Sequence, residues 1–226
     1  SLVGSEMCIR DSTGRVQFGI FYYNADSRGN RGIEGDNSEY NQSATPLSKP
    51  IMYNLTFIGG GVPGFDEANS PGIYLRRGAG GEFNNIVVTN FYSPGLDIAD
   101  AATQAQLDNG NLKINGLLLW NNGLGTSAPN TVTGQVSSNA ATQGCAQGTR
   151  GQCKMFVVRD PIMKRPFEWS DPDFRGYFGS PIFRTGWVQP PDDGFFDQTA
   201  YFVGGVGEKV WWEEWTSFLQ DVDIRK

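Results

Sequence analysis

Acidic, basic and aromatic residues recur at matching places in three short segments, each of which begins with a glycine and an apolar residue. The segments are residues 32–36 (GIEGD), 72–76 (GIYLR) and 95–99 (GLDIA). If these strands stack in parallel, Glu34, Tyr74 and Asp97 form one outward row, and Asp36 and Arg76 belong to the next. Stacked strands lie about 4.8 Å apart, so the Glu34 and Asp97 carboxylates would stand on the order of 10 Å apart across the tyrosine ring.

Two carboxylates at this separation are near the upper end of the range used by inverting glycosidases, and an aromatic ring between them offers a platform for a sugar. We therefore take Glu34, Asp36, Tyr74, Arg76 and Asp97 as candidate saccharide contacts. The alternative is a solvated outer face on which Asp36 and Arg76 form a modest ion pair. No residue is assigned as catalytic, because a register shift of one residue would turn Glu34 and Asp97 inward.

An internal repeat indicates the strands that must hold these rows. Three segments align on the asparagines Asn54, Asn85 and Asn115, which stand 31 and 30 residues apart. The segments are residues 51–58, 82–90 and 112–120. A fixed interval of this length is typical of a solenoid, and runs of β-branched and aromatic residues bounded by Gly, Asn and Pro favour strands. We expect the asparagines at the corners to stack through side-chain hydrogen bonds.

The sequence divides into four parts. Residues 1–12 (SLVGSEMCIRDS) have no hydrophobic period and resemble a translated sequencing-adapter artefact, so we expect the native chain to begin near Thr13. Residues 13–125 carry the coils of the solenoid with loop insertions. Residues 126–154 are expected to form a long polar loop, and residues 155–226 the last strand or strands and a cap over the end of the stack.

Two insertions have features of their own. Residues 101–110 contain enough alanine and glutamine for one or two helical turns. Cys145 and Cys153 bracket a short polar stretch, and in an oxidising compartment they would form a disulfide that stabilises the fold by about 2–3 kcal/mol. Free thiols and a metal site are the alternatives for this pair.

Composition and charge exclude several classes of function. The 226 residues include 30 glycines and 12 prolines but no histidine, and the formal net charge is −6. Without histidine there is no Ser-His-Asp or Cys-His triad and no histidine zinc site, and we assign no metal ligands. The negative charge argues against nucleic acid and anionic membranes as partners. No apolar run approaches the ~18–20 residues that a membrane span needs.

Several runs occur in an order that is found in a known group of proteins. They are residues 31–37 (RGIEGDN), 50–59 (PIMYNLTFIG), 72–78 (GIYLRRG), 95–98 (GLDI), 194–197 (GFFD) and 211–215 (WWEEW). Together they resemble uncharacterised secreted or surface-attached bacterial proteins with a pectin-lyase-like right-handed β-helix. The resemblance covers residues 17–216 with gaps. It implies a secreted or cell-surface location, N-terminal coils and a signal peptide that this fragment lacks, and it supplies no catalytic residues.

The repeat and the resemblance together predict an all-β fold. We expect a single-stranded right-handed parallel β-helix, a solenoid of about four partial coils, with an irregular Trp/Pro-rich C-terminal cap.

The resemblance also brings in the chemistry of β-helix lyases, which use carboxylate-bound calcium and an arginine or lysine base beside a uronate. Asp97, Asp100 and Asp108 could supply oxygen ligands, and Arg76 or Arg77 the base. Their spacing matches no calcium loop. We therefore expect no cofactor, with calcium as the remaining alternative.

The leading hypothesis is a non-enzymatic extracellular or cell-surface β-helix protein that acts as a scaffold, or binds polysaccharide or another surface through loops along one face. The alternative is a polysaccharide lyase or glycoside hydrolase that uses carboxylates on the outer face. A third hypothesis is a purely structural part of a larger secreted protein.

Overall fold

The body of the protein consists of two parallel β-sheets that the chain visits in turn. The computed structural model describes residues 7–9, 12–23, 31–63, 70–125, 131, 134–154, 157–168, 170–184 and 186–213. The long-strand sheet contains β2 (Arg15–Tyr22), β4 (Ile51–Ile58), β6 (Gly81–Thr89), β8 (Leu112–Trp120), β9 (Cys153–Lys154) and β10 (Val157–Val158). The short-strand sheet contains β1 (Met7–Ile9), β3 (Ile33–Asp36), β5 (Ile73–Arg76) and β7 (Leu96–Ile98), in that order.

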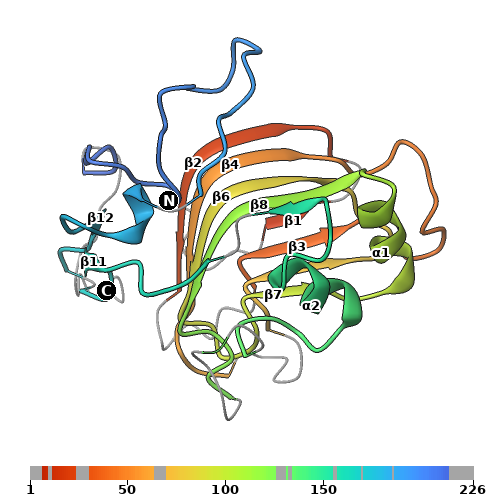
Figure 1. Ribbon diagram of the computed structural model, residues 1–226, viewed down its shortest axis with the longest axis horizontal. Coiled ribbons are helices and arrows are strands. Elements are labelled where there is room, and N and C mark those ends of the chain that lie inside the picture. Colours follow the sequence, from red (N-terminus) through yellow and green to blue (C-terminus); the bar gives the residue numbers. More distant parts are fainter. Residues whose placement is uncertain are drawn as a thin grey trace, which may run out of the picture.

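Within each sheet, a strand pairs in parallel with the strand that holds the same place in the next repeat. From β2 to β8 the chain alternates between the sheets, so that β2, β4, β6 and β8 stack on one side and β3, β5 and β7 on the other (Figure 1). The interval in the later repeats is 31 residues, as in the Glu82–Lys113 and Asn84–Asn115 pairs. The predicted all-β class is confirmed, with parallel sheets.

Each long strand bends at a residue in the left-handed backbone conformation. These residues are Phe18, Asn54, Asn85 and Gly116, with φ values of 62°, 55°, 57° and 64°. Asparagine and glycine tolerate this conformation best, which explains the repeated asparagine. The sequence alignment was wrong by one residue at the third strand, because Asn115 pairs with Asn84, and Gly116 takes the left-handed position.

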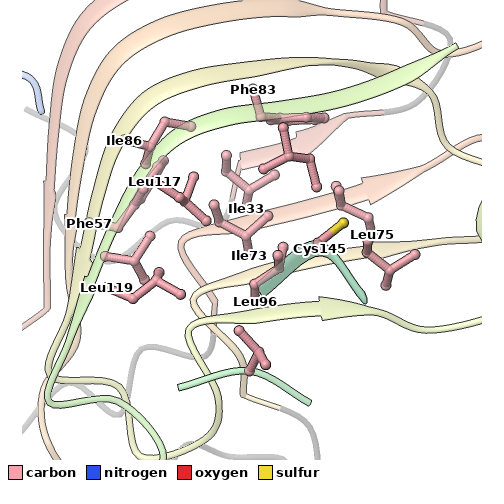
Figure 2. Packing of buried hydrophobic residues seen from close by; sticks show 14 of the residues in the cluster. Ile33, Phe57, Ile73, Leu75, Phe83, Ile86, Leu96, Leu117, Leu119 and Cys145 are labelled. Atoms are coloured by element: carbon pink, nitrogen blue, oxygen red, sulfur yellow. The ribbon is translucent and has the colours of Figure 1, made fainter. Parts of the chain in front are cut away.

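The main hydrophobic core lies between the two sheets. Ile33, Ile73 and Leu96, which were predicted to point inward, are fully buried on the short-strand sheet. They face residues such as Phe57 and Leu117 from the long-strand sheet (Figure 2). Each inward position is stacked on an apolar residue of the neighbouring repeat, so the core is continuous along the stack.

Two short helices lie in the insertions after β7 and β8. Helix α1 (Ala101–Asp108) confirms the helical turns predicted for residues 101–110, and Asp100 caps it by accepting a hydrogen bond from the Thr103 amide at 2.8 Å. Helix α2 (Ala140–Ala146) falls where a polar loop was expected, because Ala141 and Cys145 are buried in the main core. Neither these helices nor any other described helix is long and apolar enough to cross a membrane.

The C-terminal segment, residues 163–213, packs on the outer face of the long-strand sheet. It contains the antiparallel pair β11 (Met163–Arg165) and β12 (Asp173–Gly176) and the short helix η2 (Pro181–Phe183). Outward residues of three neighbouring strands, Ile58, Val87 and Leu118, form a second buried cluster with residues of this segment. The described contacts therefore run across the face of the sheet, whereas the sequence suggested cover for the end of the stack.

The left-handed asparagines attach this segment to the sheet. The Asn54 side chain donates to the Phe202 carbonyl at 2.7 Å, and the Asn85 side chain exchanges two hydrogen bonds of 2.7 Å with the Val188 backbone. The stacked asparagine pairs that the sequence suggested form elsewhere, and one of them joins Asn84 to Asn115. Asn54 and Asn85 thus hold the added segment.

Replacing Gly205 with alanine should loosen this attachment. The new Cβ would lie 2.1 Å from the Gly19 carbonyl oxygen of β2, so the backbone of the segment or the sheet must shift. We expect the free energy of unfolding, measured by urea denaturation, to fall by about 1–3 kcal/mol. The control is Gly151→Ala, where an added Cβ meets nothing within 4 Å. Equal stability of the two variants would contradict close packing at Gly205.

Alkaline pH should destabilise the same region. Burial raises the pKa of Tyr22 to about 12, and burial together with the nearby Glu82 carboxylate raises the pKa of Tyr53 to about 12. An unfolded tyrosine has a pKa of about 10. The stability that comes from keeping these two tyrosines protonated is therefore complete below pH 10 and is lost as the pH rises to 12. At pH 11 the Tyr53→Phe variant should have lost about 1 kcal/mol less of its free energy of unfolding than the wild-type protein. The measurement is urea denaturation from pH 8 to 12. The same loss in both proteins would contradict the prediction.

Candidate functional site

The strand pairing brings the predicted candidate residues together. Glu34 pairs with Tyr74 and Tyr74 with Asp97, while Asp36 pairs with Arg76. This is the register that the sequence suggested, and it places all five side chains on the face of the short-strand sheet that points away from the core.

The two carboxylates of β3 are buried, whereas both interpretations of the sequence, saccharide contacts or a solvated face, require them to be exposed. Glu34 is 7 % exposed and Asp36 is 3 % exposed. Glu34 is paired with Arg31, at 3.1 Å, and with Arg76. Asp36 accepts from Arg76 Nε and from Arg77, each at 2.8 Å. Each carboxylate is therefore bound by two guanidinium groups, and the predicted Asp36–Arg76 ion pair is one part of a larger cluster.

An insertion lies against one end of this cluster. The Asn37 side chain donates to the backbone carbonyls of Gln42 and Ala44, which folds residues 38–49 back over the strand ends. An added Cβ at Gly78 would lie 2.1 Å from the Gln42 carbonyl oxygen, so this loop fits closely against the turn after β5. The loop therefore holds the turn that carries Arg77, one of the partners that the buried Asp36 requires.

Tyr74 does not offer an open face for a sugar. Its ring lies between two guanidinium groups, with centroid distances of 4.8 Å to Arg31 and 5.1 Å to Arg76. Only 9 % of the residue is exposed. Cation–π contacts of this kind stabilise the arginines, so the aromatic platform expected from the sequence is occupied by the protein's own cations.

Asp97 is held by a different insertion. It accepts hydrogen bonds from the Ser137 hydroxyl at 2.5 Å and the Asn139 amide at 2.7 Å. The disulfide between Cys145 of α2 and Cys153 of β9 confirms the predicted bond and fixes the helix that follows Asn139. Asp97 therefore serves to anchor this insertion to β7.

The three aspartates considered as calcium ligands are engaged separately. Asp97 binds Ser137 and Asn139, Asp100 caps α1, and Asp108 pairs with Arg150. Across the described parts of the chain, no group of three or more acidic or cysteine side chains is placed to hold a metal ion.

Arg76 is poorly suited to act as a base. Burial by itself lowers the pKa of its guanidinium, but the hydrogen bond to Asp36 and the charges of Asp36 and Glu34 outweigh burial and raise the pKa above its ordinary value. A base must release its proton near the working pH, and these carboxylates hold the proton on Arg76 more firmly.

The comparison with known proteins agrees with this architecture. The model of the pectate-lyase-like beta helix domain matches residues 13–157, which include β2 to β8 and all five candidate residues. The chain belongs to this family of β-helix domains. No curated protein and no solved structure matches the chain. The five candidate residues lie within the matched β-helix domain, and the C-terminal segment lies after it.

Sequence reasoning did not place two arginines in the cluster: Arg31 was not considered, and Arg77 was considered only as a possible lyase base. Arg31 stands three residues before Glu34, a spacing that suggests no contact in an extended strand, and Arg77 follows Arg76 in a turn. The backbone at Arg77 is left-handed, with φ of 55°, and this directs its side chain back to Asp36. The sequence does contain a signal: three arginines stand on or beside β3, which carries Glu34 and Asp36, and its neighbour β5. Their number could have indicated that the two carboxylates are neutralised.

Removing Arg76 should cost much more stability than removing an exposed cation. Arg76→Ala leaves Glu34 and Asp36 buried with one guanidinium each, and we expect a loss of about 2–3 kcal/mol in urea denaturation. The control is Lys113→Ala, which removes an exposed ion pair to Glu82 and should cost less than about 1 kcal/mol. Adding Glu34→Gln to Arg76→Ala should restore part of the loss. Similar costs for the two alanine variants would contradict a structural role for the cluster.

Proposed function

We propose that this protein is a non-enzymatic extracellular or cell-surface β-helix protein that contacts polysaccharide or another surface. The proposal that the protein is not an enzyme is supported by Glu34 and Asp36, which are buried and each paired with two arginines. A glycosidase needs one carboxyl that gives up a proton to the substrate and a second that activates water or attacks the sugar. Neither role suits carboxylates that are neutralised and covered.

Exposed aromatic rings support the binding part of the proposal. Most lie in the C-terminal segment, and Tyr40 lies in the insertion after β3; the set is Tyr40, Phe167, Tyr177, Phe178, Phe195, Tyr201 and Trp211. Sugars present apolar C–H faces, and aromatic side chains with free faces stack on them. Single exposed apolar residues are ordinary, but several aromatic rings on one added segment favour a contact surface.

The scaffold in this proposal is a right-handed solenoid of about four coils, with the C-terminal segment as a cover that also carries contact residues. The Cys145–Cys153 disulfide supports an oxidising, extracytoplasmic location. The matched family, named for its likeness to pectate lyases, supports a relation to polysaccharides.

The test compares binding and turnover on one panel of polysaccharides, both acidic and neutral, with calcium present. We expect the 226-residue chain to be retarded in affinity gels that contain some of these polymers. Neither unsaturated products, detected by near-ultraviolet absorbance, nor new reducing ends should appear.

A product in either assay that disappears in the Glu34→Gln variant would establish the lyase or glycosidase alternative. Retardation by none of the polymers would instead contradict the binding proposal, and would leave the purely structural role.

A further inference from the structure

A pocket of about 350 Å³ lies within the C-terminal segment, beyond the residues that match the β-helix family. Its walls come from the β11–β12 pair, the turn after β12 and the helix η2. The side chains that line it are Lys164, Arg175, Phe178, Phe183, Arg184 and Glu208. The volume is at the lower end of the roughly 300–1,000 Å³ that is usual for small-ligand sites.

Positive charge predominates in this pocket. Arg175 is satisfied by two hydrogen bonds to the buried Asp173, at 2.9 and 2.6 Å. Lys164 lies farther from the Asp173 carboxylate, at 3.9 Å. This single carboxylate is therefore shared by Arg175 and Lys164. Arg184 has no acidic partner among the described residues and lies over the Phe178 ring, with 5.7 Å to the centroid. Lys164 and Arg184 are thus available to an anion.

Phe178 is fully exposed although its backbone is firmly held. It lies in a turn closed by the hydrogen bond from the Ser180 amide to the Tyr177 carbonyl, at 2.9 Å, and the buried Ser180 hydroxyl donates to the Pro161 carbonyl. The Tyr177 amide also donates to the Ile162 carbonyl at 2.9 Å. Because the ring is 100 % exposed, it adds no hydrophobic stabilisation to the fold. Because its turn is fixed, its free face is already oriented for a ligand.

We propose that this pocket binds an anionic sugar unit. The sugar ring stacks on Phe178, Arg184 and Lys164 bind a carboxylate or sulfate carried by the ring, and Glu208 accepts hydrogen bonds from hydroxyl groups. Planar guanidinium groups suit both oxyanions. The chain as a whole is negative, at −6, but salt screens charges beyond about 8–10 Å, so the local cations determine the contact.

This inference deepens the proposed function and rests on it for the view that the natural ligand is a polysaccharide. The pocket itself can be tested with single sugars. The probes are glucuronate, glucose 6-sulfate and neutral glucose, with binding measured by saturation-transfer NMR and titration on the 226-residue chain. The relative affinities of the first two distinguish a carboxylate ligand from a sulfate ligand.

The variants are Phe178→Ala and Arg184→Gln, both at exposed positions where little stability is at stake. Matched controls are Tyr40→Ala, an aromatic residue that is 97 % exposed in the insertion after β3, and Arg159→Gln, an exposed arginine that does not line the pocket. We expect at least one acidic sugar to bind more tightly than glucose. Each pocket variant should weaken it about tenfold or more, and the controls should not change it.

Two results would overturn the pocket. In the first, the acidic sugars bind no better than glucose. In the second, they bind equally well to the wild-type protein and both pocket variants. If the polysaccharide panel still retards the chain, only the pocket is refuted and the proposed function stands. If the single sugars bind as expected but no polymer retards the chain, the pocket stands and the polysaccharide function is refuted.

Discussion

Parallel stacking, with one strand of each repeat in each sheet, is the constraint on which the rest of the structure depends. A residue on one strand lies against its equivalent on the next, so each position must suit its neighbours as well as its own strand. On the inner face this produces the apolar row of Ile33, Ile73 and Leu96. On the outer face it places Asp36 against Arg76, and the opposite charges pair across the strands.

An added segment covers the outer face of the long-strand sheet. This is the C-terminal segment, which lies on the other side of the molecule from α1 and α2 (Figure 1). Phe178 and Arg184, the exposed side chains of the proposed sugar site, belong to this segment. In the proposed function the β-helix domain supports this segment, and the contacts with sugars lie on the segment.

The sequence was informative where the stacking constraint acts and uninformative where it does not. The parallel rows followed from spacing, because repeats at a fixed interval can stack in only a few ways. The alignment failed at Asn115, since glycine can replace asparagine in a left-handed position without any change in geometry. Burial of Glu34 and Asp36 could not be predicted, because it depends on how three arginines gather around the two carboxylates.

The left-handed positions on the long strands also bear on the order in which the protein folds. The bonds that attach the C-terminal segment join residues far apart in the chain: 148 residues for Asn54 and Phe202, and 180 for Gln17 and Asp197. In each pair the earlier residue, Asn54 of β4 or Gln17 of β2, lies on a strand that is synthesised before the segment. Closing such distant contacts is slow for an unfolded chain, whereas neighbouring repeats can pair as they emerge. We therefore expect the segment to dock after the strands have paired, with its backbone bound by the side chains at the bends, Asn54 and Asn85.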